Sequence, residues 1–301
     1  MSKKNIGYCC LVFICLVWGT TYLFTRMAVA SFPAFFFSGI RNVSAGLLLL
    51  VVLIFTPNKF TWSWGNVLPN IISGLMIVGL GSGLVTWSVK FIPSGLASLI
   101  CTLIPLNIVV LSLFTQKSSR LNGLILGGIV SGLLGMGFIF RDHVKELGNS
   151  EYATGVLVAF IGCVCWSAGT IFSRTKTVHT NSFYNAAIQL LAGGILSLMM
   201  SFFSGEWNHL GNIKPESMAA LVYLIVVGSA AAFAAYQYAL TSLPVGLVAT
   251  YAYINPLIAV LLGSLVLSEK LTGFTCLAFI LTLAGVYFVN KGYKLIKIPV
   301  S

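Results

Sequence analysis

The chain carries the same sequence pattern twice, about 150 positions apart. A tryptophan, a phenylalanine and an arginine recur 148 positions further on: Trp18, Phe24 and Arg26 become Trp166, Phe172 and Arg174. Prolines and a glycine repeat with an offset of 151: Pro93, Gly95 and Pro105 become Pro244, Gly246 and Pro256. Insertions in loops would produce such small changes in offset. We therefore expect two like halves, residues 1–145 and 146–301.

The composition independently predicts an integral membrane protein. The chain is 58% hydrophobic and 8% charged, with a mean hydropathy of +0.98, so it cannot build a water-facing surface. A membrane-spanning helix needs about 20 mostly apolar residues. The sequence offers ten such runs: 6–25, 33–55, 67–89, 94–115, 122–140, 153–173, 182–203, 217–240, 245–267 and 273–291.

Five spans in each half would place the halves upside down relative to one another, because an odd number of crossings ends on the opposite membrane face. Inverted repeats are the architecture of alternating-access transporters. We therefore predict an all-α integral membrane protein with ten transmembrane helices, arranged as two inverted five-helix repeats around a central cavity.

The positive charges predict the orientation of these spans. With the amino terminus inside, the inner segments hold Lys3, Lys4, Lys59, Lys117, Arg120, Arg174, Lys176, Lys291, Lys294 and Lys297. The outer segments hold Arg26, Lys90, Arg141, Lys145, Lys214 and Lys270. This excess obeys the positive-inside rule. It predicts a multi-pass protein of the cell membrane, in bacteria the inner membrane, with both termini in the cytoplasm. The net charge of +11 is then a topology signal, and we expect no nucleic-acid partner.

Cysteine and histidine positions predict no metal site. The seven cysteines lie in or at the edge of apolar runs without the paired spacing of zinc ligands, and His143, His179 and His209 fall on separate loops. We expect no metal, no cofactor and no structural disulfide. The expected partners are a small-molecule substrate and membrane lipids, and a monomer is compatible with the sequence.

Several segments resemble the EamA type of the drug/metabolite transporter superfamily. They are Trp18-Gly-Thr-Thr-Tyr22, the stretch ending in Arg41, Pro93-Ser-Gly95 with Pro105, and the second-half stretch from Pro244 through Pro256 to Glu269 and Gly285. The resemblance covers residues 8–290 and implies ten helices in two inverted repeats, exporting or exchanging small metabolites. One departure is that the first half has Ser118-Ser119-Arg120 where the second has Ser268-Glu269-Lys270. Any ion pair of Glu269 would therefore have no counterpart in the first half.

A repeated aromatic and cationic stripe predicts gates. Trp18, Tyr22 and Arg26 lie on one helix face at spacings of four, and Trp166, Thr170 and Arg174 repeat the stripe. One interpretation makes Trp18, Tyr22 and Trp166 gate residues at opposite mouths of a cavity. The other is interfacial anchoring, in which tryptophan packs and arginine reaches lipid headgroups. The repetition does not distinguish between these two interpretations, because anchoring residues would repeat as well.

Arg41 lies about eight residues into the second predicted span, where an isolated cation should face water or a partner. Its counterpart 148 positions on is Gln189. In the functional interpretation Arg41 meets an anionic group, such as a substrate carboxylate, and Gln189 supplies hydrogen bonds. In the structural interpretation Arg41 binds carbonyls of a neighbouring helix.

Two prolines and a group of polar aromatic residues predict a binding cavity at mid-membrane. Pro105 and Pro256 each remove a helical hydrogen bond, and we expect them to act as hinges. Nearby candidates for binding a molecule with polar and flat parts are Trp87, Tyr236, Gln237, Tyr251 and Asn255. The amides could instead simply join helices by hydrogen bonds.

The absence of Asp and Glu from every predicted span argues against proton antiport through a carboxylate. We predict a secondary transporter of small metabolites, an amino acid or related compound, that works by alternating access in export or exchange. One alternative is a flippase for a lipid-linked metabolite, which would need a lateral opening between helices. A less favoured alternative is an integral membrane enzyme, for which the sequence shows neither a nucleophile motif nor a histidine with an acidic partner.

Overall fold

A computed structural model describes residues 2–55, 63–115, 122–142, 146–177, 181–267 and 273–295, and every regular element in these ranges is helical. The first half contributes α1 (Lys3–Val29), α2 (Ala34–Ile54), α3 (Trp64–Gly74), the π-helical η1 (Leu75–Ser82), α4 (Gly83–Ser88), α5 (Ser94–Ile100), the 3-10 turn η2 (Cys101–Leu103), α6 (Ile104–Thr115) and α7 (Gly123–Asp142).

The second half repeats this order after the short η3 (Glu146–Gly148). Its elements are α8 (Ser150–Lys176), α9 (Ser182–Phe203), η4 (Glu206–His209), α10 (Pro215–Tyr223), the π-helical η5 (Leu224–Ala231), α11 (Ala232–Ser242), α12 (Val245–Val248), α13 (Tyr251–Leu267) and α14 (Gly273–Leu295). The third span of each half is thus α3–η1–α4 or α10–η5–α11.

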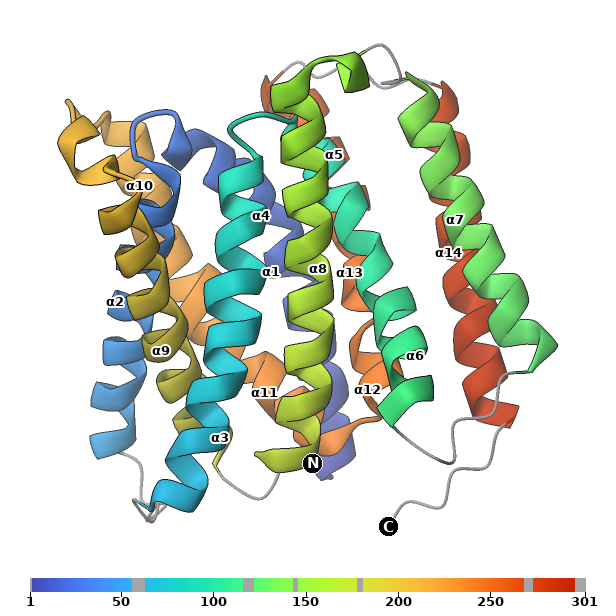
Figure 1. The fold of residues 1–301 in the computed structure, drawn as a ribbon. Coiled ribbons are helices and arrows are strands. Elements are labelled where there is room, and N and C mark those ends of the chain that lie inside the picture. Colours follow the sequence, from blue (N-terminus) through green and yellow to red (C-terminus); the bar gives the residue numbers. More distant parts are fainter. Residues whose placement is uncertain are drawn as a thin grey trace.

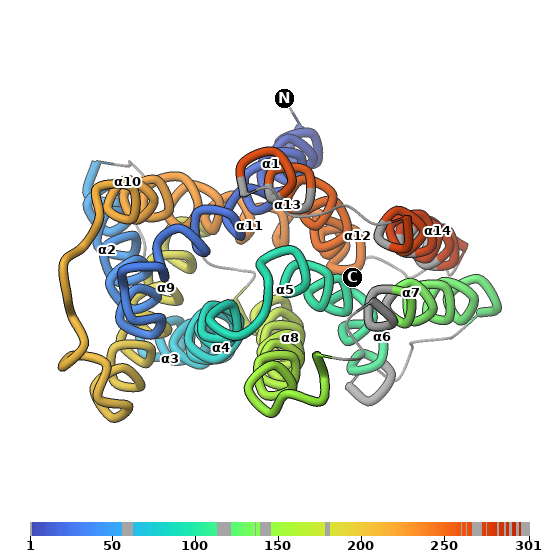
Figure 2. Tube along the Cα trace, turned by 90° about the horizontal axis from the view of Figure 1, so that it is seen from above, coloured from blue at the N-terminus to red at the C-terminus, as the bar shows by residue number. Residues whose placement is uncertain are grey.

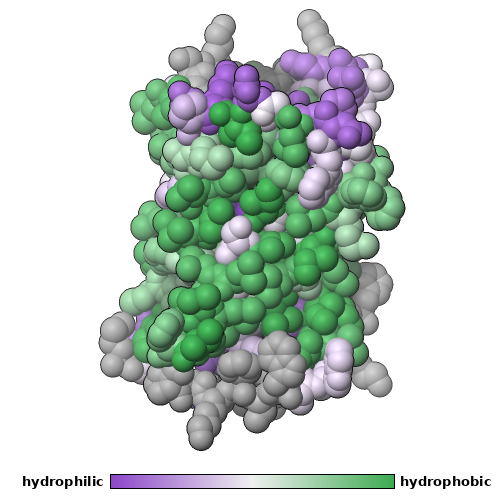
Figure 3. Space-filling model, turned by 90° about the vertical axis from the view of Figure 1, so that its left-hand side faces the viewer, coloured by the Kyte–Doolittle hydropathy of each residue, from purple (hydrophilic) through white to green (hydrophobic). Residues whose placement is uncertain are grey.

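The predicted ten-span, all-α membrane fold is confirmed. Among the described residues, eight helical segments are long and apolar enough to cross a membrane, and shorter apolar stretches occur at Gly123–Gly135 in α7 and Cys276–Gly285 in α14. Each predicted apolar run coincides with one of the ten helical segments. Figure 3 shows the resulting broad hydrophobic band, with hydrophilic residues gathered at its upper end.

The two halves run in opposite directions. In Figure 1, α1 starts at the lower end of the bundle, beside the amino terminus, whereas α8 starts at the upper end. Repeat-related helices pack in pairs, α2 on α9 and α7 on α14, and these pairs form opposite edges of the bundle (Figure 2). The first helix of each half packs on the third span of the other half, α1 on α11 and α8 on η1. The halves are therefore exchanged by an approximate two-fold axis between them.

Glycine allows the third span to approach α9 very closely. A Cβ atom added to Gly74 would lie 2.3 Å from the carbonyl oxygen of Gln189, and one added to Gly193 would lie 2.4 Å from the Cβ of Val78. Backbone contact at these points fixes the position of the polar side chains that α9 carries.

Some residues used in the sequence predictions lie outside the described ranges. They are Lys59, Lys117, Ser118, Ser119, Arg120, His143, Lys145, His179, Ser268, Glu269, Lys270 and Lys297.

Candidate functional site

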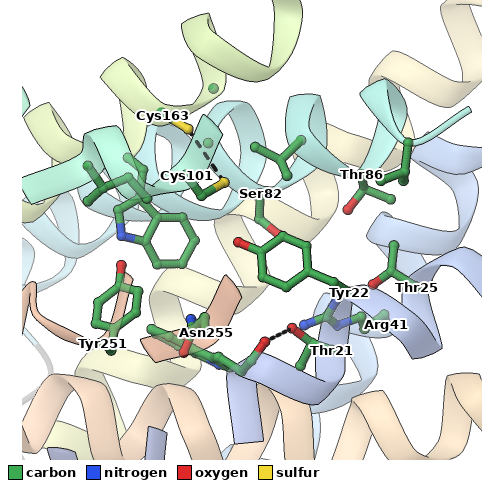
Figure 4. Close-up of a pocket in the computed structure, with 17 residues that line it drawn as sticks. Thr21, Tyr22, Thr25, Arg41, Ser82, Thr86, Cys101, Cys163, Tyr251 and Asn255 are labelled. Atoms are coloured by element: carbon green, nitrogen blue, oxygen red, sulfur yellow. Dashed lines mark hydrogen bonds between the residues drawn. The ribbon is translucent and has the colours of Figure 1, made fainter. Parts of the chain in front are cut away.

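A cavity of about 90 Å³ lies between the two halves. Six of the predicted site or gate residues line it: Trp18, Tyr22, Arg41, Trp166, Tyr251 and Asn255. Hydroxyl and thiol groups complete the polar part of the wall, from Thr21, Thr25, Ser82, Thr86, Cys101 and Cys163. Figure 4 shows Arg41, Tyr22, Thr25 and Thr86 gathered at one end of this space and Tyr251 and Asn255 at the other.

Of the described residues that line the cavity, Arg41 is the one cation, and it is 8% exposed. Its Nε donates to the hydroxyl of Ser229 over 2.7 Å, and that hydroxyl donates in turn to the side-chain oxygen of Asn42 over 3.2 Å. Among the described residues, the only salt bridge joins Lys90 and Glu206, so no described acid neutralises Arg41. A buried guanidinium of this kind is suited to an anionic group of a ligand.

Four aromatic rings close the end of the cavity opposite Arg41. Trp18 packs against Tyr251 and Tyr236 with ring centroids 4.7 and 5.2 Å apart, and against Trp166 at 5.6 Å. Tyr236 is not among the residues that line the cavity, and its hydroxyl hydrogen-bonds the hydroxyl of Thr170 over 2.7 Å. The four rings therefore form one aromatic cluster, three members of which line the cavity.

Two buried polar atoms of this cluster, Trp166 Nε1 and Tyr251 Oη, lie near one another and make no well-formed hydrogen bond with a described residue. Both side chains line the cavity. Buried polar groups almost always find a partner in the protein, in water or in a ligand. These two atoms can therefore hydrogen-bond a molecule that enters the cavity.

Asn255 lines the cavity and also joins two helices. With its amide oriented to satisfy both carbonyls, its nitrogen donates to Tyr251 O over 2.9 Å and to Cys15 O over 3.0 Å. The second bond links α13 to α1.

The other predicted amides, Gln189 and Gln237, lie outside the cavity. Gln237 Nε2 donates to Gln189 Oε1 over 2.7 Å, and Gln189 Nε2 donates to Asn70 Oδ1 over 2.9 Å. Asn70 Nδ2 donates in turn to Asn185 Oδ1 over 3.0 Å. Both glutamines are almost fully buried, so each amide is satisfied by protein rather than turned to an open space.

Trp87, another predicted binding residue, also lies outside the cavity lining. Its ring stacks on Phe35 with an interplanar angle of 13° and contacts Phe91 with a centroid distance of 4.6 Å. It therefore packs α4 onto the start of α2.

Arg26 and Arg174 each donate a hydrogen bond to a backbone carbonyl at the end of a helix. Arg26 donates to the carbonyl of Val89, the residue that ends α4, and Arg174 donates to the carbonyl of Leu240 in the last turn of α11. Each arginine thus caps the carboxyl end of its own half's third span, where a cation is favoured by the helix dipole.

The predicted hinges at Pro105 and Pro256 are displaced from the observed helix interruptions. The fourth span changes to 3-10 geometry at Cys101–Leu103, just before Pro105, which then lies in the first turn of α6 where proline is tolerated. The ninth span is interrupted at residues 249–250, between α12 and α13, while Pro256 lies inside α13.

The repeated π-helical segments were not predicted. η1 and η5 are offset by 149 positions and both reach the site: Ser82 of η1 lines the cavity, and Ser229 of η5 holds Arg41. The carbonyl of Gly228 in η5 also accepts a hydrogen bond from Trp18 Nε1 over 3.0 Å. π-Helical turns often occur at functional sites, but apolar sequence alone carries no signal for them.

Comparison with known proteins agrees with the duplicated architecture. A model of the EamA-like transporter family matches residues 5–141 and again residues 153–291. The chain is 30% identical over 280 residues to the uncharacterized inner membrane transporter YedA of Escherichia coli, covering 92% of this chain and 88% of that protein. It is 23% identical over 304 residues to a probable amino-acid metabolite efflux pump of Escherichia coli, covering 98% and 97%. A protein of known crystal structure superimposes with a TM-score of 0.73 at 22% identity, over 96% of this chain and 99% of that one.

Proposed function

Because this chain belongs to the EamA-like transporter family, we propose that it carries small metabolites across the cell membrane by alternating access, in export or exchange. The family makes the protein a multi-pass membrane transporter rather than an enzyme. The substrates that we propose carry a carboxylate or another anionic group, as amino acids and related compounds do.

The buried guanidinium of Arg41 is the observation that supports this substrate class most directly. It faces a cavity between the halves and has no described acidic partner. An anionic substrate would supply the missing countercharge. It would also gain charge-assisted hydrogen bonds, which are about twice as strong as neutral ones.

The opposite end of the cavity suits an apolar or flat substrate part. Trp18, Trp166 and Tyr251 present ring surfaces there, while Trp166 Nε1 and Tyr251 Oη are available for one or two further hydrogen bonds. In this proposal Trp18, Tyr22 and Trp166 are the residues that a substrate must pass. A name given to one relative, a probable amino-acid metabolite efflux pump, is compatible with such a substrate.

For energy coupling we propose downhill movement or exchange rather than proton antiport. Of the acids whose side chains are described, Glu206 alone is buried, and it lies in η4 beyond the end of α9 rather than in the cavity wall. No described carboxylate therefore lies where a proton and a substrate could compete for one site.

We also propose that both termini face the cytoplasm and that the halves divide at residues 145 and 146. The lysines and arginines near the amino terminus and at the end of α8 favour this orientation. The boundary falls between α7 and α8, the last span of one half and the first of the next.

A thermal-shift screen tests the substrate proposal. Detergent-purified protein is melted in the presence of single metabolites, beside Arg41→Ala, Tyr251→Ala and, as a control outside the cavity, Trp87→Phe. We expect anionic metabolites to stabilise the parent and Trp87→Phe but neither cavity variant. A ligand that stabilises Arg41→Ala as much as the parent would contradict the assigned site.

Uptake of that metabolite into proteoliposomes tests the transport cycle. We expect uptake down its own gradient, or in exchange for internal substrate, with no loss when a protonophore is added. Uptake that requires a pH gradient would overturn the coupling proposal while leaving the substrate site intact.

A further inference from the structure

A buried polar cluster lies toward the end of the bundle opposite the cavity. We call Asn70, Ser173, Asn185, Gln189 and Gln237 the amide network. Its bonds connect α3, α8, α9 and α11: besides the amide contacts above, Gln189 Nε2 donates to Ser173 Oγ over 3.2 Å, and Asn185 Nδ2 donates to the carbonyl of Thr177 over 2.8 Å. Each of the five side chains is no more than 1% exposed.

The amide network occupies the position that mirrors the cavity. Two of its members are repeat counterparts of residues that line the cavity: Ser173 of Thr25 and Gln189 of Arg41, both at an offset of 148. Because the fold exchanges its halves about an approximate two-fold axis, these positions surround equivalent spaces. One of the two spaces is open, and the other is filled by hydrogen-bonded amides.

The two spaces also reach opposite ends of the bundle. The cavity wall includes Thr25 and Val89, beside the Arg26 cap at the end of α1. The amide network includes Ser173, beside the Arg174 cap at the end of α8. The aromatic rings of Trp18, Trp166 and Tyr236 lie between them.

We infer that the amide network is the closed form of a second substrate pathway, which opens toward the Arg174 end when the cavity closes. This inference rests on the transport cycle proposed above. Opening breaks the hydrogen bonds that the network makes among α3, α8, α9 and α11 and exposes the amides of Gln189 and Gln237. A substrate then meets the cation Arg41 from one side of the membrane and uncharged amides from the other.

Hydrogen bonds suit this role better than apolar packing. Amides that lose their protein partners can bond to water or to the polar groups of a substrate, so the network can open without leaving buried polar groups unsatisfied. Separating two apolar surfaces would expose them to water, which is unfavourable. Opening the hydrogen-bonded network avoids most of this cost.

Thiol labelling in membranes tests the inference without any substrate. Leu240, the counterpart of the cavity residue Val89 at an offset of 151, is buried beside the network. Leu240→Cys supplies a reporter on the closed side, and the native Cys101 reports on the cavity. A small methanethiosulfonate reagent is applied, and the rate at each thiol is read by peptide mass spectrometry.

Gln189→Leu with Gln237→Leu leaves Asn70 Oδ1 and Ser173 Oγ buried without their glutamine partners in the closed form, a cost that exceeds the added apolar packing. We therefore expect this double variant to raise the labelling rate at position 240 about tenfold, equivalent to about 1.4 kcal/mol, and to lower the rate at Cys101. The milder Ser173→Ala should act in the same direction and covers the case in which the double variant fails to fold. Asn122→Leu is the matched control, because it removes side-chain amide hydrogen bonds outside the network, from Asn122 Nδ2 to Gly292 O and from the Ile125 N–H to Asn122 Oδ1.

Unchanged rates at both thiols, or a rise at both, would show that the network only holds the helices together, and would overturn the inference. The same reciprocal change in Asn122→Leu would also overturn it. If the labelling rate rises at position 240 and falls at Cys101 in a protein that transports none of the tested metabolites, the proposed function is contradicted but the second pathway is not.

Discussion

Trp18 and Trp166, which are 148 positions apart and related by the repeat, meet edge to face with ring centroids 5.6 Å apart and an interplanar angle of 88°. Both rings lie where the two halves meet, yet their indole nitrogens differ in their hydrogen bonding. Trp18 Nε1 donates to the carbonyl of Gly228, whereas Trp166 Nε1 makes no well-formed hydrogen bond with a described residue. The fold is therefore symmetric in its helices and asymmetric in its site chemistry.

This asymmetry predicts different costs for two equivalent substitutions. Trp18→Phe removes a buried hydrogen bond to the π-helical segment, besides part of a ring, and should reduce stability by about 1–3 kcal/mol. Trp166→Phe loses only packing and should reduce it less. Apparent melting temperatures of the two purified variants measure the difference, and equal losses would show that the bond to Gly228 contributes nothing.

Arg41 predicts a loss of affinity for an anionic ligand. Arg41→Gln removes charge-assisted hydrogen bonds that are each worth about 1.5–3 kcal/mol, so the ligand Kd should rise about tenfold to a hundredfold. Arg41→Lys keeps the charge but lacks the planar fork and the Nε bond to Ser229, and it should recover only part of the affinity.

Ser229→Ala is the control for Arg41, because it removes the partner that positions the guanidinium but leaves the charge in place. Its effect on Kd, measured by titration of the purified protein, should be smaller than that of Arg41→Gln. An Arg41→Gln protein that binds anionic and neutral ligands as the parent does would remove Arg41 from the site.

Gly74 predicts a packing limit between the third span and α9. Gly74→Ala places a Cβ atom 2.3 Å from the backbone oxygen of Gln189, which a shift of side chains cannot relieve. Overpacking of this kind costs about 1–3 kcal/mol or more, and we expect lower folded yield in detergent by size-exclusion chromatography. Gly127→Ala is the matched control, because a Cβ atom there meets nothing within 4 Å.

Much of the fold could be predicted from the sequence, because apolar length and repeat spacing determine the number and direction of the spans. The site was harder to predict. Arg41 stands out because a cation is unusual within a span, but Gln189 and Gln237 could equally line a space or bond to each other. The repeat relates Gln189 to Arg41 and does not show which of the two faces an open space; in the structure Arg41 lines the cavity, whereas Gln189 bonds to Gln237.

Contacts between distant segments could not be predicted from the sequence either. Glu206 appears in the sequence as a loop acid, yet its Oε2 accepts the backbone N–H of Phe36 over 2.9 Å and caps α2, whose own N-cap residue Pro33 provides no side-chain bond. Nothing in local sequence indicates a cap supplied from 170 positions away.

The Glu206 cap predicts a graded stability series. Glu206→Ala leaves the Phe36 N–H without its acceptor and should cost about 1–2 kcal/mol. Glu206→Gln retains an acceptor and should cost less. Lys90→Met removes an ion pair of 3.7 Å whose lysine is 37% exposed, so it should cost under about 1 kcal/mol. Melting temperatures rank the three, and a Lys90→Met loss equal to that of Glu206→Ala would assign the effect to charge pairing.

The opposed directions of α1 and α8 predict which introduced thiols an impermeant reagent can reach in intact cells. Lys4→Cys and Lys176→Cys lie toward one end of the bundle, and Glu151→Cys and Lys214→Cys toward the other, because α8 runs from Ser150 at one face to Lys176 at the other. All four native side chains are exposed. With the termini in the cytoplasm, a charged maleimide should label positions 151 and 214 in intact cells and positions 4 and 176 only after permeabilisation. The reverse pattern would invert the proposed orientation without affecting the fold, whereas labelling of positions 4 and 151 from the same side would contradict the inverted repeat and, with it, alternating access between two exchanged halves.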